Sequence, residues 1–284
     1  MPLTSVVAYF NQHLASFNPA SSLHCQAEIH YASHHLEGGI SARLGDLTLI
    51  PDMRAIRTPG GDIMGWEGEL MVQDGHQRSL RREALYLYAW DSEDIVFVDR
   101  FLRVLHALHY LHCLSMAPLN ALRGHDQWQL MLDVHWRHMR AVHDAHGEVF
   151  EGLLQRLGLS TRQIVLRLQA PMLIEDSHAH AAVRSFIQRG YTLLVDHLSV
   201  DDPAWSLMQS LGVCWVSPDT GRWQSHHTGQ WVRHDQWVRE AHRHGLKVLL
   251  RRPPKGREAL MTHADAVLDA SLTVTALPAQ ARTG

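Results

Sequence analysis

Histidine is the residue type in this sequence that most suggests chemistry, since 23 of the 284 residues are histidines. His106, His109 and His112 recur every three residues beside Cys113. On a helix these side chains would share one side, where imidazole groups can together hold Zn²⁺. The alternative, which we favour, is that they form the solvated flank of an amphipathic helix.

A second histidine-rich stretch, residues 135–146, contains four histidines but no H-E-x-x-H pattern. The sequence therefore does not predict a catalytic zinc site there. It also contains neither the G-x-S-x-G pattern of a nucleophile elbow nor the G-x-x-x-x-G-K-[ST] pattern of a phosphate-binding loop. We expect neither of those two kinds of hydrolase.

Aromatic and basic side chains gather in residues 222–237, which include Trp223, Trp231 and Trp237. Trp and Arg are enriched where proteins bind one another, so these tryptophans are candidate anchors of an interface. The alternative is an amphipathic helix over residues 231–244 that lies on the body of the protein itself.

The composition is that of a folded, mildly acidic protein, with 45% apolar residues, 19% charged residues and a formal net charge of −3. Wholesale disorder is excluded, and this charge gives no reason to expect direct binding of nucleic acid. Cys25, Cys113 and Cys214 form no recognisable disulfide framework, which favours a reduced, cytoplasmic location. No signal peptide is recognisable, and no apolar run approaches the ~20 residues of a membrane helix, so we expect no membrane contact.

Runs of Val, Leu and Ile alternate with amphipathic segments from residue 47 onward, as expected of strands buried on both faces between helices. The expected strands are 47–50, 63–70, 130–134, 164–169, 191–196, 213–216, 247–250 and 266–269. The expected helices are 4–16, 98–112, 148–157, 178–189, 204–211 and 231–244. This order predicts an α/β fold with a parallel sheet, first a closed (β/α)8 barrel and second a doubly wound open sheet. We expect an N-terminal extension at 1–44, the barrel at 45–278 and a tail at 279–284.

Seven segments in order resemble the motifs of the EAL domains, bacterial phosphodiesterases that linearise cyclic di-GMP. They are 64-MGWEGEL-70 (the E-A-L strand), 99-DRFL-102 (L-D-R), 132-LDVHW-136 (V-N-x-S), 153–171 (L-E-x-T-E), 186–219 (D-D-F-G and K-I-D), 241–260 (E-G-V-E) and 265–269 (the last strand). The resemblance covers residues 45–278 and implies an EAL-type, TIM-like barrel.

In EAL domains two divalent cations activate the attacking water, and the resemblance implies which residues stand at those positions here. These remnant metal-site positions are Glu67, His135, Arg167, Asp196, His197, Ser217 and Arg251. Five of the metal-binding positions are acidic in EAL domains. Here two of them remain carboxylates, two have become arginine and one is the neutral His197, so the formal charge of the five changes from that of five carboxylates to zero. Arginine cannot deprotonate to become a ligand. We therefore expect no bound metal, no other cofactor and no catalytic residue; Mg²⁺ or Mn²⁺ would be needed only in an active enzyme.

Arg167 and Arg251 allow two interpretations. Guanidinium groups match phosphate oxygens, so the two residues could bind the phosphates of cyclic di-GMP. Alternatively, they pair with Glu67 and Asp196 and fill the former cavity. We favour the pairing, which makes binding of cyclic di-GMP doubtful.

The expected function is that of a catalytically inactive EAL-like regulator in bacterial cyclic di-GMP-linked signalling. Its partner would be another protein, such as a transcription or motility regulator, and a homodimer is compatible with the way EAL domains often pair. The alternatives are a cyclic di-GMP receptor without turnover, an active phosphodiesterase with rearranged ligands, and a histidine-based metal protein.

Overall fold

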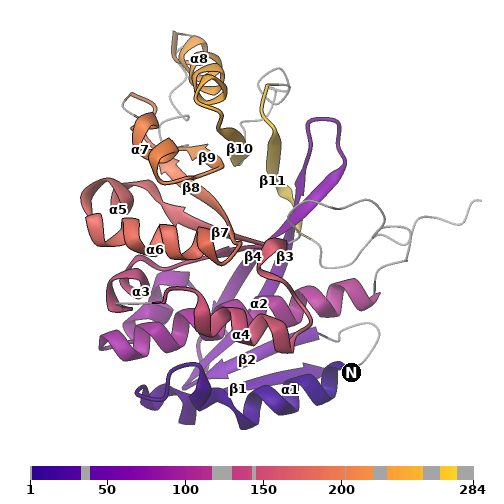
Figure 1. Ribbon diagram of the computed structural model, residues 1–284. Helices are drawn as coiled ribbons and strands as arrows, with labels where there is room; N and C mark the ends of the chain where they lie inside the picture. Colours follow the sequence, from indigo (N-terminus) through magenta and orange to yellow (C-terminus); the bar gives the residue numbers. More distant parts are fainter. Residues whose placement is uncertain are drawn as a thin grey trace, which may run out of the picture.

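The computed structural model describes residues 2–32, 39–116, 130–142, 145–201, 203–219, 229–251 and 263–273, with the side chains of 229–234 and 269–273 left out. One eleven-stranded sheet runs through these residues and closes on itself (Figure 1). Its strands are β1 (Ala27–Ala32), β2 (Gly39–Leu44), β3 (Leu47–Arg57), β4 (Ile63–Gln73), β5 (Ser79–Leu80), β6 (Leu130–Asp133), β7 (Ile164–Gln169), β8 (Thr192–Leu198), β9 (Trp215–Pro218), β10 (Lys247–Arg251) and β11 (Ala266–Thr273).

Eight strands form the closed barrel, in the order β3–β4–β6–β7–β8–β9–β10–β11, and β11 pairs back onto β3. The neighbours from β4 to β11 are parallel, whereas β3 is antiparallel to both β4 and β11. The predicted barrel and its eight strands are confirmed, and the sheet is parallel except at β3. A tight turn joins β3 to β4, with Thr58 N donating to Asp62 O at 2.8 Å. So short a connection permits only a hairpin, because a parallel crossover needs a dozen or more residues.

The N-terminal residues extend the same sheet. Strand β1 pairs with β2, and β2 pairs with β3, both antiparallel. Helix α1 (Leu3–Gln12) buries Val6, Val7 and Phe10 in the large core that also contains the outer faces of the barrel strands. The sequence did not lead us to expect β1 or β2. Residue 45 as a domain boundary stays a prediction.

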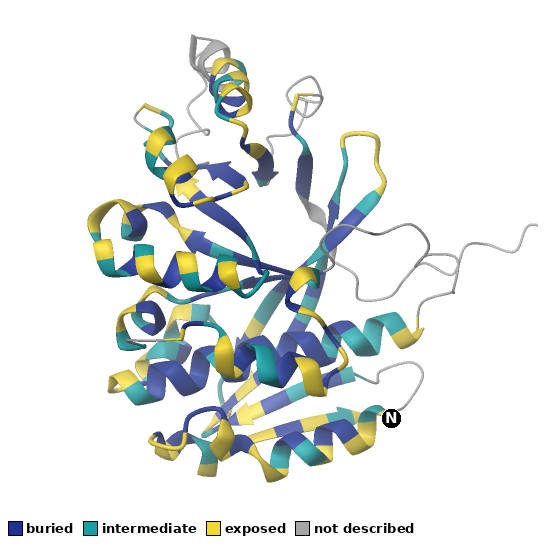
Figure 2. Ribbon diagram, in the orientation of Figure 1, coloured by how far each residue is buried: buried dark blue, intermediate teal, exposed yellow. Residues whose placement is uncertain are grey.

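Helices pack on the outside of the sheet, with α1 against β1 and the later helices around the barrel (Figures 1 and 2). After α1 they are α2 (Ser92–Met116), α3 (Trp136–Ala141), α4 (Glu148–Arg156), α5 (Ala170–Glu175), α6 (Ser177–Gln188), α7 (Trp205–Ser210) and α8 (Gly229–Arg243). All six predicted helices are present, while the short helices α3 and α5 were missed. Within the described ranges, no helix combines the length and apolarity needed to cross a membrane.

A separate apolar cluster fills the barrel interior, and every barrel strand contributes to it. Its members are Ile56, Met64, Met131, Val165, Leu194, Trp215, Leu249, Ala266 and Leu268. Side chains alternate between the two faces of a strand, so the residue two positions further along points inward again. From β6 to β10 these next inward positions are polar, and they lie at the carboxyl ends of the strands.

Gly68 on β4 lets helix α2 approach the barrel closely. A Cβ at this position would lie 2.8 Å from Cδ2 of His106, whose ring nitrogens lie 2.7 Å from Leu102 O and 2.9 Å from Glu69 O. Because this anchored ring cannot yield easily, we expect Gly68→Ala to lower the free energy of unfolding by about 1–3 kcal/mol in urea denaturation. The control Gly152→Ala lies in α4 with open space around it, so it should raise that free energy by about 0.5–1 kcal/mol. Equal effects of the two changes would contradict close packing at Gly68.

Candidate functional site

Six polar side chains form the layer directly above the apolar interior, five of them toward the carboxyl ends of adjacent strands and the sixth midway along β4. They are Glu67 on β4, Asp133 on β6, Arg167 on β7, Asp196 on β8, Ser217 on β9 and Arg251 on β10. Asp133 lies opposite Arg167 in the β6–β7 pairing. Closure of the barrel brings Glu67 into contact with Arg251, 184 positions later in the chain.

Arg167 contacts three carboxylates from three strands. Its Nε and Nη2 donate to the two carboxylate oxygens of Asp133, with Nη2 2.6 Å from Oδ2. Its Nη1 donates to Oε1 of Glu67 at 2.6 Å and lies 3.6 Å from Oδ2 of Asp196. The forked contact with Asp133 is the geometry in which guanidinium and carboxylate groups interact most strongly.

Two further arginines complete the ion pairs. Arg251 donates from Nη1 to the same Oε1 of Glu67, and its Nε lies 3.3 Å from Oδ2 of Asp196. Arg82, in the 3-10 helix η3 (Arg82–Leu87), donates to Oδ2 of Asp133. We call the six ionic residues the arginine–carboxylate cluster: Arg82, Arg167, Arg251, Glu67, Asp133 and Asp196. Its three positive and three negative charges cancel.

The charges in this cluster stabilise one another's ionised forms. Burial would raise the pKa of Asp133, but the guanidinium groups of Arg167 and Arg82 outweigh it and hold that pKa well below its usual range. Burial opposes the charge of Arg167, yet Asp133 and Glu67 raise its pKa above the usual value. Asp133 likewise raises the pKa of Arg82 against the effect of burial. None of these arginines can therefore become neutral and accept a cation.

Most carboxylate oxygens of the cluster are already engaged. Both oxygens of Asp133 and Oε1 of Glu67 accept from arginines, and Oδ1 of Asp196 accepts from the backbone N–H of His197 at 2.8 Å. Glu67 Oε2 and the Ser217 hydroxyl are buried without a hydrogen-bond partner in the part of the chain that the structure describes. A cation arriving here would meet Oε2 of Glu67 and Oδ2 of Asp196, and Oδ2 of Asp196 already lies 3.6 Å from Nη1 of Arg167 and 3.3 Å from Nε of Arg251.

Solved structures with the same architecture are EAL proteins. The EAL enzyme Bd1971 in its cGMP-bound form matches with a TM-score of 0.63 and 14% identity, over 78% of this chain and 61% of that one. The PaMucR phosphodiesterase in complex with c-di-GMP has the same TM-score and identity, over 78% of this chain and 89% of that one. Klebsiella pneumoniae BlrP1, in a manganese and cyclic di-GMP complex, matches with a TM-score of 0.61 and 14% identity, over 96% of this chain and 66% of that one. This chain has the fold of an EAL domain.

The likeness to EAL domains is one of fold, since the sequence identity is only 14%. The chain spans about three fifths of the length of Bd1971, 61%. No protein-family model and no curated protein matches the sequence.

The cluster does not fit the pair of divalent cations that the EAL resemblance implies. Mg²⁺ and Mn²⁺ take oxygen ligands, and here the oxygens of Asp133 and Glu67 bind guanidinium groups instead. Across the described residues, no three His, Cys, Asp or Glu side chains are arranged to hold a metal ion. At this end of the barrel the described carboxylates are therefore paired with guanidinium groups rather than arranged around a cation.

The strand register adds one residue to the sequence-derived set. Asp133, which we did not single out, faces the barrel interior beside Arg167, whereas His135 lies beyond the end of β6. The His135 ring stacks on Tyr86 at 3.9 Å, and Nδ1 of His135 accepts from the backbone N–H of Arg137 at the start of α3. The two-residue alternation that runs through Met131 would have identified Asp133.

His197 lies at the rim of the cluster. Its side chain is half exposed, and its ring nitrogens lie 3.8 Å from a carboxylate oxygen of Asp196 and 3.8 Å from one of Asp219. Its backbone adopts a left-handed conformation with φ of 57°, in the stretch where the pairing of β8 with β9 shifts register. The structure thus brings together Glu67, Arg167, Asp196 and Arg251, with Ser217 in the same layer.

Of the three tryptophans proposed as interface anchors, the structure describes the side chain of Trp237. Trp237 is buried, its indole N–H donates to Ser199 O at 3.1 Å, and its ring contacts Trp205 with centroids 4.9 Å apart. An anchor must be exposed in the free protein, so Trp237 does not serve as one. Trp223 and the side chain of Trp231 lie outside the described residues.

The three histidines of α2 differ in their surroundings. Both ring nitrogens of His106 face backbone carbonyl oxygens, so His106 is a buried structural residue. His109 Nε2 lies 3.6 Å from Cys113 Sγ, and the rings of His109 and His112 are 6.2 Å apart. The geometry therefore gives no support to a histidine-based metal site on this helix.

Proposed function

We propose that this chain is a catalytically inactive EAL-type regulator that acts by binding a partner protein in bacterial cyclic di-GMP-linked signalling. The observation that carries the proposal is the pairing of Arg167 and Arg251 with the same carboxylate, that of Glu67. Two-metal hydrolysis needs carboxylates free to hold both ions, and a guanidinium beside each carboxylate opposes this. The cluster thus replaces a metal-binding centre with a self-neutralised ionic layer.

Turnover of cyclic di-GMP tests the proposed loss of catalysis. With Mg²⁺ or Mn²⁺ present, we expect the purified protein to release no linear product above a no-enzyme blank. PaMucR, a phosphodiesterase of the same fold, serves as the positive control. Metal-dependent release of linear product that is lost on Glu67→Gln would show the proposal to be wrong.

Exposed aromatic and aliphatic side chains support a protein partner. Trp90 is 88% exposed and Leu87 is 78% exposed, at the end of the segment that begins with Arg82. Trp136, at the start of α3, is also exposed and lies under the guanidinium of Arg140 at 5.2 Å. Exposed Trp and Arg side chains of this kind often dominate binding energy in protein interfaces.

A partner recovered from native cell extract should bind the purified chain directly, and Trp90→Ala should weaken that binding by about tenfold or more. Arg43→Ala changes an exposed side chain on β2 and serves as the control, which should leave the affinity unchanged. Failure to find any direct partner, or equal affinity of the Trp90 variant, would count against protein binding. The homodimer and the cytoplasmic location stay predictions.

A cyclic di-GMP receptor without turnover is the second candidate, because PaMucR and BlrP1 were both solved with this nucleotide. In this chain the nucleotide would have to draw Arg167 or Arg251 away from Glu67. Calorimetry without metal separates the two candidates. Saturable binding at micromolar or lower concentration that is lost in Arg251→Met would favour the receptor.

A further inference from the structure

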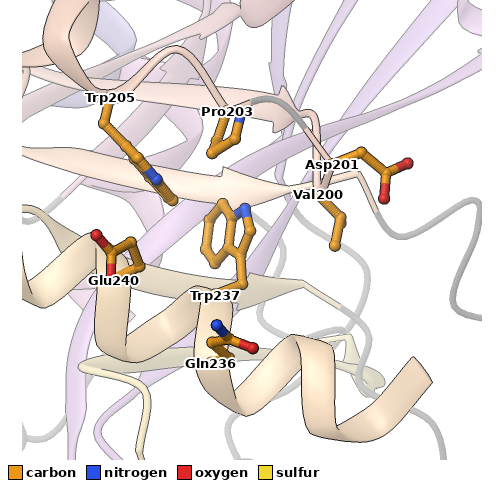
Figure 3. Close-up of a pocket in the computed structure, with 7 residues that line it drawn as sticks. All are labelled: Val200, Asp201, Pro203, Trp205, Gln236, Trp237 and Glu240. Carbon is orange, nitrogen blue, oxygen red and sulfur yellow. The ribbon is translucent and has the colours of Figure 1, made fainter. Parts of the chain in front are cut away.

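A cavity of about 330 Å³ lies between the segment that follows β8 and helix α8 (Figure 3). It is lined by Val200, Asp201, Pro203, Trp205, Gln236, Trp237 and Glu240. Figure 3 shows Trp237 in the middle, with Trp205 and Glu240 on one side and Val200 and Asp201 on the other. No residue of the arginine–carboxylate cluster lines this cavity.

The two indole rings are held in place before any ligand arrives. The N–H of Trp237 donates to Ser199 O at 3.1 Å, which fixes the ring relative to the segment after β8. Trp205 packs against Trp237 at 4.9 Å, and its ring also stacks with His244 at 5.8 Å and an interplanar angle of 19°. A binding site whose aromatic walls are already positioned loses little conformational entropy when a ligand enters.

The charge of the lining is negative. Asp201 and Glu240 contribute carboxylates, and among the described residues that line the cavity none is basic. Glu240 accepts from Arg243 at 2.8 Å, and His244 Nε2 lies 3.6 Å from its other oxygen. The Arg243 side chain is 73% exposed, so solvent screens this pair and a ligand cation can compete for the carboxylate.

We propose that this cavity binds a small organic cation with an alkylated ammonium head. Indole rings attract such weakly hydrated cations, and half-buried Trp205 offers more accessible ring surface than buried Trp237. The carboxylate of Glu240 supplies the opposite charge. The volume lies at the lower end of the ~300–1,000 Å³ typical of ligand pockets, which suits a compact ligand. A bare metal ion is disfavoured, because in the described residues no group of acidic side chains is arranged to coordinate one.

Calorimetry with choline as the probe tests this proposal, and 3,3-dimethylbutan-1-ol is its uncharged isostere. We expect saturable choline binding with a Kd of about 0.1–5 mM and at least tenfold weaker binding of the isostere. Absence of saturable choline binding, or equal affinity for the two compounds, would overturn the proposal.

Two charge variants make the test specific to this cavity. Glu240→Gln keeps the shape of the lining and should weaken choline binding about fivefold or more, whereas Gln236→Glu adds a carboxylate and should strengthen it. Glu148→Gln changes an exposed residue of α4 and is the matched control, with no expected effect. If the Glu240 and Gln236 variants both bind choline like the original chain, the cation is bound elsewhere and the assignment fails. This test is independent of whether the chain hydrolyses cyclic di-GMP.

Discussion

Arg167→Met is expected to lower the free energy of unfolding by about 3–5 kcal/mol at neutral pH. The substitution keeps an unbranched apolar stem but removes the guanidinium that binds both oxygens of Asp133 and one oxygen of Glu67. Glu67 is buried, so its charge would be left with Arg251 alone, and Asp133 would keep only Arg82. Urea denaturation followed by circular dichroism measures the change.

The matched control for this prediction is Arg43→Met. Arg43 forms an ion pair with Glu28 at 3.3 Å, but its side chain is 61% exposed, so the expected change is within about 0.5 kcal/mol. The double variant Arg167→Met with Asp133→Asn should recover part of the lost stability, because it removes the stranded charge. A loss below about 1 kcal/mol for Arg167→Met alone would mean that the cluster does not hold the barrel end together.

Acid sensitivity is the second large effect, and one of its sources is a buried network between α2 and α3. Arg103 Nη2 donates to Asp99 at 2.5 Å and lies 3.4 Å from Nε2 of His138, while Nδ1 of His138 lies 3.3 Å from Asp99. In this arrangement His138 is neutral, because a proton on Nε2 would face the N–H of Arg103. Burial lowers the pKa of His138 to about 3, against the opposing effect of Asp99.

The sign of the pH dependence follows from this lowered pKa. As the pH falls below ~6.5, the unfolded chain binds a proton at residue 138 before the folded chain does, so stability is lost. The titration of His138 alone should lower the free energy of unfolding by about 2 kcal/mol between pH 6.5 and pH 5. His138→Gln keeps one donor and one acceptor but cannot titrate. It should therefore reduce the slope of the free energy of unfolding against pH by the equivalent of about one bound proton. Equal slopes for the original chain and this variant would contradict the assignment.

The barrel strands could be predicted because their residues are Val, Leu and Ile in uninterrupted runs, as in 164–169 and 191–196. The strand Ala27–Ala32 is short and lies at the edge of the sheet, and its apolar residues alternate with Glu28 and His30. The sequence pattern that would predict a strand is therefore weak in this segment. The antiparallel course of β3 is encoded in the short turn at 58–62. A parallel neighbour would need a crossover of a dozen or more residues, which this turn is too short to provide.

The ionic cluster was foreseen only through the resemblance to EAL motifs. That resemblance identified Glu67, Arg167, Asp196 and Arg251, and the ion-pairing alternative for the two arginines matches the contacts observed. It did not include Asp133, because a motif match identifies a segment but not every residue that faces the barrel interior. Arg82 could not be foreseen, since it enters the cluster from a 3-10 helix outside the barrel strands.

Anomalous scattering at the manganese edge, from a crystal soaked in Mn²⁺, tests the central claim most directly. The account predicts no anomalous peak beside Glu67 and Asp196, with both arginine side chains still bound to Glu67. Two manganese ions about 3.5–4 Å apart at those carboxylates, with Arg167 and Arg251 turned away, would contradict it.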